Sequence, residues 1–279
     1  MRVGDLPISE RTLIMGILNV TPDSFSEKGD FFQAEDAIRH GIRMVEEGAD
    51  IIDIGAESTR PGAEPVSTAA EMQRLTPVVE ELAERINIPI SIDTTKSSVA
   101  ERMLDLGASI VNDISALQFD EEMAPLVSER KCPLIMMHMQ GSPRTMQKEP
   151  TYTHVITDIR DFLRERVESA VTQGISERNL ILDPGIGFGK TVEHNLQIIR
   201  HLDKFRELGY PLLIGASRKS FIGKQLDLPV TERLEGSLAA AAIAIWQGAD
   251  IIRVHDVAAS VRTAQMVDAM RGEKEAPEV

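Results

Sequence analysis

The chain has 279 residues, of which 42% are hydrophobic, so it is long enough to bury a full core, and one domain is the default expectation. Its 44 acidic residues outnumber its 30 basic residues and give a net charge of −14, which argues against nucleic acid or an anionic membrane as a partner. No run approaches the roughly 20 apolar residues of a membrane span. Residues Met1 to Arg11 lack a basic start followed by an apolar stretch, so we expect a protein that is not exported. The single cysteine, Cys132, suits a reducing compartment, so we expect a cytoplasmic protein.

Short apolar runs alternate along the chain with longer segments of helical pattern. The runs are rich in Ile, Val or Leu and lack apolar/polar alternation, which predicts strands of a parallel sheet covered on both faces. The eight predicted strands are Leu13–Val20, Asp50–Gly55, Pro89–Asp93, Ser109–Ser115, Pro133–Met139, Leu180–Gly185, Pro211–Ser217 and Ile251–Val257. The eight predicted helices are Ala34–Glu47, Thr68–Arg85, Ser97–Leu106, Glu121–Arg130, His154–Gln173, Val192–Leu208, Thr231–Trp246 and Ala258–Met270.

Glycine pairs mark the ends of several predicted helices, because glycine just past a helix supplies a left-handed cap. These pairs are Gly48-Ala49, Gly107-Ala108, Gly209-Tyr210 and Gly248-Ala249. Eight strand and helix units in strict alternation predict an α/β fold, a closed (β/α)₈ TIM barrel with its helices outside, since parallel crossovers are right-handed. A doubly wound open sheet is the alternative. We expect residues 1–279 to form a single barrel domain, with a disordered tail over residues 272–279.

Polar residues gather at the carboxyl ends of the predicted strands, where barrels of this kind carry their active sites. Polar groups at the ends of buried strands are costly unless paired, so their convergence on one rim predicts a shared ligand. The alternative for each residue is that it caps the next helix or links neighbouring strands. In chain order the residues are Asn19, Asp53 with Glu57, Asp93, Asn112 with Asp113, His138, Asp183, Ser217-Arg218-Lys219, and Arg253 with His255.

Two of these groups are cationic and belong to the last two predicted strands. Ser217-Arg218-Lys219-Ser220 ends the seventh strand, and the eighth carries Arg253-Val254-His255. Barrels commonly bind phosphate at this place, with a helix N-terminus and fixed cations. In so acidic a chain, the placement favours an anionic substrate. Pairing of the same cations with nearby carboxylates is the alternative.

A glycine-rich turn follows the sixth predicted strand, from Asp183 to Lys190 with the sequence DPGIGFGK. It lacks the spacing of a phosphate-binding loop, so we interpret it as a tight turn that lets a flat ligand approach Asp183, with Phe188 as a stacking face. Two polar loops, TPDSFS from Thr21 and ESTRPG from Glu57, follow the first two strands and are candidate lids at the barrel mouth.

Five separated motifs in this chain resemble those of the dihydropteroate synthase family. They are MGILNVTPDSFS from Met15, ESTRPG from Glu57, MHMQG from Met137, DPGIGFG from Asp183 and SRKS from Ser217. The resemblance runs in order from Met15 to about Asp256, which is nearly the whole chain. Two departures are Ala56, where the family usually has glycine, and Ser115-Ala116, where a Ser-Gly pair is common.

The resemblance implies that 6-hydroxymethyl-7,8-dihydropterin pyrophosphate reacts with p-aminobenzoate, with Mg²⁺ as cofactor and pyrophosphate as leaving group. It implies pterin contacts from Asp93, Asn112, Met137, Asp183, Phe188, Gly215 and Lys219. It implies p-aminobenzoate contacts, where sulfonamides would compete, from Thr59, Arg60, Pro61 and Ser220. The implied pyrophosphate ligands are Asn19, which also contacts the metal, with Thr59, Arg253 and His255. The implied catalytic residues are Asp93, Lys219, Arg253 and His255.

The residue chemistry agrees with these implied roles. A carboxylate such as Asp183 accepts two hydrogen bonds at once from the guanidine-like edge of a pterin. A departing pyrophosphate needs its developing charge neutralised, which Arg253, His255 and Mg²⁺ would do. The family also implies a homodimer through the late helices. Two alternatives stay open: a methyltetrahydrofolate-dependent corrinoid methyltransferase, in which the phosphate-end cations would lack a purpose, and a catalytically silent folate-binding homologue.

Overall fold

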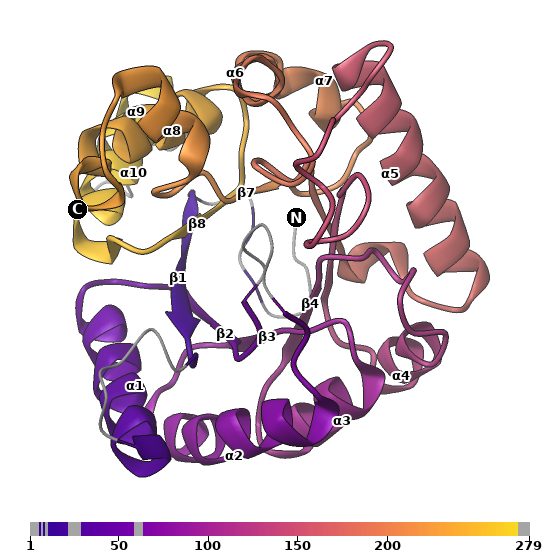
Figure 1. Cartoon of the computed structure of the whole chain (residues 1–279), viewed down its shortest axis with the longest axis vertical. Helices are drawn as coiled ribbons and strands as arrows, with labels where there is room; N and C mark the ends of the chain where they lie inside the picture. The colour runs from indigo at the N-terminus through magenta and orange to yellow at the C-terminus, as the bar shows by residue number, and fades with distance from the viewer. Residues whose placement is uncertain (1–5, 7, 9–10, 22–28, 59–63, 273–279) are drawn as a thin grey trace.

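Eight parallel strands form a ring with helices around its outside, which confirms the predicted TIM barrel (Figure 1). The computed structural model describes residues 6, 8, 11–21, 29–58 and 64–272. The strands pair in the order β6-β5-β4-β3-β2-β1-β8-β7, and a bridge between Leu182 and Leu212 brings the two ends of this series together. Closure by parallel pairing places the carboxyl ends of all strands on one rim.

The strands begin within two residues of their predicted starts and end earlier than predicted in most cases. They are β1 Leu13–Asn19, β2 Ile51–Gly55, β3 Ile90–Asp93, β4 Ile110–Asp113, β5 Leu134–Met137, β6 Leu180–Asp183, β7 Leu213–Ile214 and β8 Ile251–Val254. The early ends leave the polar residues that follow several strands outside the ladders, where their backbone turns toward the next helix.

The helices match the predicted segments with two exceptions. They are α1 Gly29–Glu46, α2 Thr68–Arg85, α3 Ser97–Asp105, α4 Met123–Arg130, α5 Val155–Thr172, α6 Val192–Arg200, α7 Asp203–Arg206, α8 Ser220–Leu226, α9 Leu234–Trp246 and α10 Val257–Arg271. The single helix predicted over Val192–Leu208 is broken at His201, so that Leu202 and Phe205 are both fully buried. The short helix α8 was not predicted, because it follows directly on the strand-end motif.

Two apolar layers lie on the two sides of the strands. The outer layer fills the space between strands and helices, and the inner layer fills the lower barrel. The inner layer consists of Leu13, Met15, Ile51, Ile110, Ile135, Ile181, Leu213 and Ile251, joined by Leu6 and Ile8 from the segment before β1. Leu6 and Ile8 therefore seal the end of the barrel opposite the polar rim.

The predicted glycine caps and the predicted tail have different outcomes. Gly48, Gly107, Gly209 and Gly248 all have positive φ, which confirms their predicted left-handed conformation. Of the predicted tail only Gly272 lies within the described residues, and it caps α10.

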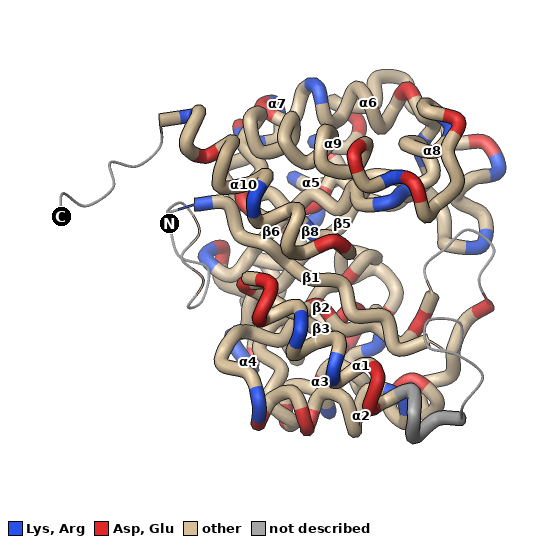
Figure 2. Tube along the Cα trace, turned by 90° about the vertical axis from the view of Figure 1, so that its left-hand side faces the viewer, with Lys and Arg blue, Asp and Glu red and all other residues tan. Residues whose placement is uncertain are grey.

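Charged residues are spread over the outer helices and loops (Figure 2). None of the described helices is both long and apolar enough to cross a membrane.

Candidate active site

Arg253 on β8 lies at the centre of the polar rim. It donates from Nε to Asp53 of β2 at 2.6 Å and from Nη2 to Asp93 of β3 at 2.8 Å. Asn112 of β4 adds a hydrogen bond from Nδ2 to the same Asp53 oxygen at 3.2 Å. Barrel closure thus joins residues 200 positions apart in the sequence into one buried group.

Burial controls the charges in this group. It raises the pKa of Asp93 to about 7, opposed by Arg253 and aided by the neighbouring acids Asp53, Glu71 and Asp113. Burial alone would lower the pKa of Arg253, but Asp53 and Asp93 outweigh it, so the pKa is raised and the guanidinium stays charged. The group therefore keeps a fixed cation beside a carboxyl that takes up a proton near neutral pH.

Asp53 has no role predicted from the sequence beyond its membership of the polar rim. Its side chain is fully buried, and it accepts from Arg253 and Asn112 through Oδ2, whereas Oδ1 has no hydrogen-bond partner among the described residues. The available signal was its position among the polar strand ends. Its position between Arg253 and Asn112 depends on contacts across the barrel, which no local sequence pattern reveals.

A second group surrounds Gly215, just after β7. The Asp183 Oδ1 atom accepts from the Gly185 backbone N–H at 2.7 Å, and burial raises the pKa of Asp183 against the nearby cations. Lys219 donates from Nζ to the Ile186 carbonyl and lies 4.6 Å from the ring centre of Phe188. Burial lowers the pKa of Lys219 to about 8, and Asp183 opposes that shift.

Gly215 keeps the space between these cations open. A Cβ atom at this position would lie 3.7 Å from Cβ of Arg253 and 3.8 Å from Nζ of Lys219. These are ordinary van der Waals distances, so the missing side chain leaves room for a small group beside Lys219 and Arg253. This is the arrangement expected where a ligand, rather than a side chain, completes the packing.

Apolar side chains form one wall of the rim. Met137, Ile114, Met139 and Met146 are buried in one cluster, and Phe188 packs against them. The structure thus brings Met137 and Phe188 together. A flat ring would find here the apolar and aromatic contacts that such ligands need.

His255 lies at the part of the rim where the sequence predicts phosphate binding. Its Nδ1 atom lies 3.0 Å from Oγ of Ser217, which also accepts from the His255 backbone N–H at 3.2 Å. Burial, with Arg253 and Arg218, lowers the pKa of His255 to about 4, so the imidazole is neutral at pH 7 in the absence of an anion. Only an approaching negative charge would favour its protonation.

For two strand-end residues, Arg218 and Asp113, the alternative of a purely structural role is correct. Arg218 pairs with Asp256 through Nε at 2.9 Å and Nη2 at 2.5 Å, so it serves the turn rather than the rim. Asp113 caps its own turn by accepting from Ser115 and Leu117. Ala116 in that turn has φ +51°, which explains why glycine is common there in the family.

The remaining predicted residues lie in the sequence at or just after the ends of β1, β2 and β7. Asn19 ends β1 in register with Gly55 and is half-buried, and Ser220 is the exposed first residue of α8. Ala56 is fully buried, with its carbonyl accepting from Arg74 at 3.0 Å. Thr59, Arg60, Pro61 and most of the loop that follows Thr21 lie outside the described residues.

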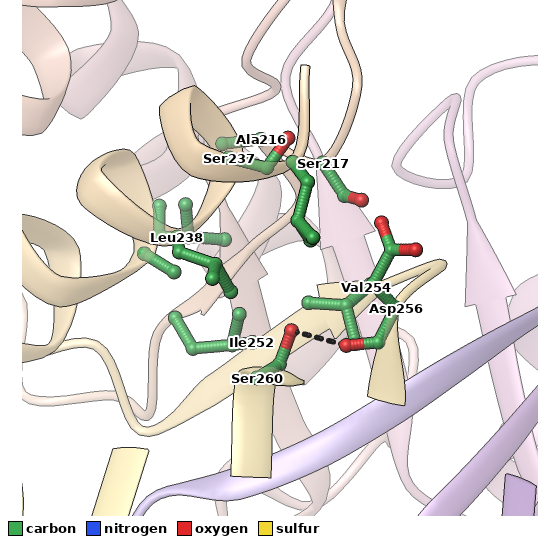
Figure 3. A pocket seen from close by; sticks show the side chains of 11 residues that line it. Ala216, Ser217, Ser237, Leu238, Ile252, Val254, Asp256 and Ser260 are labelled. Atoms are coloured by element: carbon green, nitrogen blue, oxygen red, sulfur yellow. Dashed lines mark hydrogen bonds between the residues drawn. The ribbon is translucent and has the colours of Figure 1, made fainter. Parts of the chain in front are cut away.

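A small hollow lies behind Ser217, between β7, β8, α9 and α10 (Figure 3). Ser237, Asp256 and Ser260 line it together with apolar residues such as Leu238, and Ser260 donates to the Asp256 carbonyl at 2.7 Å. Side chains alternate along a strand, so the hollow's Ile252 and Val254 lie on the opposite face from Arg253. The hollow is therefore separate from the rim.

The chain is similar to known proteins over nearly its whole length. A family model described as pterin binding enzyme matches residues 15–255. The dihydropteroate synthase of Bacillus subtilis is 48% identical, with 95% of this chain and 90% of that protein covered. The Escherichia coli dihydropteroate synthase is 46% identical over 94% of this chain and 93% of its own length.

Solved structures of dihydropteroate synthases are also similar to this chain in fold and in sequence. Yersinia pestis dihydropteroate synthase in a sulfonamide complex has a TM-score of 0.92 and 44% identity, covering 98% of this chain and 99% of that one. The Xanthomonas albilineans dihydropteroate synthase with 4-aminobenzoic acid has a TM-score of 0.89 and 41% identity, with 94% of each chain covered. Sequence, fold and rim geometry thus agree, and the chain belongs to the dihydropteroate synthase family.

Proposed function

We propose that the rim binds a pterin pyrophosphate and p-aminobenzoate and joins them, as a dihydropteroate synthase does. The chain is a transferase: the p-aminobenzoate nitrogen bonds to the pterin methylene carbon, the C–O bond to pyrophosphate breaks, and the amine loses a proton. The observation that carries the placement is the convergence of Asp183, Lys219 and Arg253 around the open space at Gly215.

The pterin ring lies between Asp183 and the Met137 wall. Asp183 accepts two hydrogen bonds from the guanidine-like edge, and Asp93 and Asn112 contact the adjoining edges. Phe188 stacks on the ring. Lys219 reaches the ring carbonyl side, and its lowered pKa makes it a proton donor near neutral pH.

The pyrophosphate lies against Arg253 and His255. Two carboxylates already engage Nε and Nη2 of Arg253, so the anion meets the remaining N–H groups of the guanidinium. A neutral His255 donates from one ring nitrogen and becomes more basic as the phosphate charge approaches. Both contacts gain strength as charge develops on the leaving group.

Mg²⁺ fits this site as a metal held mainly by the substrate. In the described part of the chain, no group of three His, Cys, Asp or Glu side chains is placed to hold a metal ion. Mg²⁺ bound by phosphate oxygens and water needs only one or two protein oxygens, and the amide oxygen of Asn19 would provide one. When bound, the ion neutralises charge on the pyrophosphate.

The p-aminobenzoate lies between Ser220 and the loop that carries Thr59, Arg60 and Pro61, where sulfonamides compete. The solved relatives with 4-aminobenzoic acid and with a sulfonamide support this ligand class. The loop is polar in sequence and has little apolar content, so we expect this pocket to form only beside bound pterin and Mg²⁺-pyrophosphate. Sulfonamide titrations into the free and the loaded enzyme test this order, and equal affinities would refute it.

A homodimer through α9 and α10 completes the proposal. Ile243, Trp246, Met266 and Met270 are all more than half exposed on these two packed helices. Exposed apolar side chains gathered on neighbouring helices are typical of a protein interface. Trp246→Glu places a charge in this proposed interface, so sedimentation experiments on the variant should show monomers. Phe119→Glu, at an equally exposed aromatic residue after β4, should leave the dimer intact.

The proposal treats residues 1–279 as one pterin-binding barrel domain in the cytoplasm. The alternation of strands and helices in the described residues between Leu13 and Arg271 supports one domain, and the single buried free Cys132 suits a reducing compartment. The corrinoid methyltransferase alternative and the silent homologue are not favoured, because the relatives are dihydropteroate synthases. Release of pyrophosphate and formation of dihydropteroate, measured with and without Mg²⁺, test the activity and the metal together.

A further inference from the structure

Lys190 has no part in the site proposed above, yet it is only 3% exposed at the end of the glycine-rich turn. Its Nζ atom donates to Nδ1 of His138 at 2.9 Å and to the Phe188 carbonyl at 2.9 Å, with the His138 carbonyl at 3.4 Å. Three acceptors match the three N–H bonds of an ammonium group. Such complete pairing is what makes the burial of a lysine tolerable. Burial lowers the pKa of Lys190 well below its ordinary value, and the nearby Asp183 opposes this shift.

His138 is built to accept this hydrogen bond. Burial and the nearby Lys190 lower the pKa of His138 to about 2, so the ring is neutral and keeps a lone pair for Nδ1. The ring is held edge-on against Phe162, with 4.8 Å between the ring centres. Lys190 therefore binds a group whose position is already determined by packing.

The bond joins two segments that touch along their backbones. A Cβ atom at Gly185 would lie 1.9 Å from the His138 carbonyl oxygen, and one at Gly189 would lie 2.7 Å from that of Gln140. The turn after β6 is thus pressed onto the segment after β5, and Lys190 ties them from the buried side. Gln147 reaches the same turn from the exposed side, with a bond from Nε2 to the Gly187 carbonyl at 2.7 Å.

The tied turn positions Phe188 and Asp183, two of the residues proposed to contact the pterin ring. Phe188 has its carbonyl on Lys190 and its ring beneath Lys219, so one lysine holds each side of it. Asp183 is linked to the same turn through Gly185. A shift of the turn would move the stacking face and the carboxylate together.

We propose that Lys190 and His138 are positioning residues that hold Phe188 and Asp183 in the geometry that binds the pterin ring. The inference rests on the placement of the pterin under the proposed function. It concerns ground-state binding of the ring, so loss of the tie should weaken pterin binding more than it affects p-aminobenzoate or the later chemical step.

Calorimetric titration with 6-hydroxymethylpterin tests the tie in full-length protein. Lys190→Met and His138→Leu each remove the hydrogen bond, and we expect the Kd to rise at least tenfold. His138→Asn should restore binding to within about threefold, because Oδ1 of asparagine can take the place of Nδ1. Gln147→Ala, which removes the exposed contact to the same turn, should change the Kd less than twofold. The KM for p-aminobenzoate, measured with saturating pterin pyrophosphate, should stay constant.

Backbone amide shifts of Gly185, Gly187 and Gly189 separate the inference from the function on which it rests. We expect these shifts to change in His138→Leu and to return in His138→Asn. Unchanged pterin affinity in Lys190→Met, or no recovery in His138→Asn, would overturn the tie. If the unaltered protein failed to bind the pterin, the proposed placement would fail, and unchanged amide shifts in His138→Leu would overturn the tie independently. The His138 pair also keeps the test decisive if Lys190→Met does not fold.

Discussion

The inward-facing residues of the barrel form two layers that lie two residues apart on the same strands. The lower layer contains Ile51, Ile110, Ile135, Ile181, Leu213 and Ile251, none more than 1% exposed. Two residues later the same strands, or the positions just after them, present Asp53, Asn112, Met137, Asp183, Gly215 and Arg253. A step of about 7 Å along each strand thus separates an apolar floor from the candidate site.

The two layers lie on the same strands but affect the stability of the fold in opposite directions. The floor gains stability because it removes apolar surface from water. The upper layer reduces the stability of the fold, because it buries carboxyl groups whose pKa values rise, and because Oδ1 of Asp53 has no hydrogen-bond partner in the part of the chain that the structure describes. We therefore expect substitutions in the floor to act on folding and those in the upper layer to act on ligands.

The largest effect is expected for Arg253→Ala, which removes the central cation of the upper layer. Turnover should fall by about three orders of magnitude, on the scale of a lost transition-state contact of about 4 kcal/mol. Binding of a pterin without phosphates should suffer far less. Steady-state kinetics and calorimetry measure the two, with surface Arg164→Ala as control. Equal losses in both would make Arg253 structural.

The floor counterpart is Ile181→Ala, two residues before Asp183. The free energy of unfolding should fall by about 3 kcal/mol, because a fully buried side chain is replaced by a cavity. Denaturant unfolding measures it. Pterin affinity of the folded protein should stay within twofold of normal. A tenfold loss of affinity would show that the floor also shapes the site.

Asp183→Asn tests the matching position in the upper layer. The amide presents a donor to a donor edge of the pterin, so binding should weaken by about 2 to 3 kcal/mol, on the order of a hundredfold. Stability should hold or rise, since a buried carboxylate is removed. Calorimetric titration decides, with surface Asp203→Asn as control. Unchanged affinity would contradict the assignment of Asp183.

The floor has no titratable group, so of the two regions only the upper layer and the rim residues beside it, Asp93 and His255, should contribute a pH dependence. The folded pKa of His255, about 4, is below its ordinary value of 6.5, so its contribution to stability is complete above pH 6.5 and is lost as pH falls. Asp93, with a raised pKa of about 7, acts in the opposite direction. As the pH falls from 7.5 to 5, the unaltered protein should therefore lose about 1 to 2 kcal/mol more of its free energy of unfolding than His255→Asn does. Parallel pH profiles in urea unfolding would refute this.

The smallest effect concerns Ala116, in the turn after β4. Its positive φ costs an alanine energy that glycine avoids, although glycine gains entropy when unfolded. Ala116→Gly should therefore raise the free energy of unfolding by about 0.5 kcal/mol without altering pterin affinity. Thermal unfolding checks it. A loss of stability would mean that the methyl group, which is fully buried, contributes more by packing than it costs in strain.

Local patterns in the chain predicted most of the framework. The strand starts, the helical segments and the glycine caps follow from hydrophobic period and backbone preference, which act over a few residues. The polar residue at each strand end was visible for the same reason, and so were Asp93, Asn112, Asp183 and Arg253 as members of one rim. The break at His201 was not visible, because the burial of Leu202 and Phe205 rather than local propensity determines it. The helix α8 was missed because it follows directly on the strand-end motif.

The amino-acid sequence by itself determined that eight strands alternate with eight helical segments and that each strand passes from apolar to polar. Only the closed barrel decided which of those polar groups meet. The pairing of Arg253 with Asp53, the tie of Lys190 to His138 and the seal formed by Leu6 and Ile8 all join distant segments. The physical reason is that side-chain period is a local property of the backbone, whereas charge pairing depends on distances that exist only after the ring has closed.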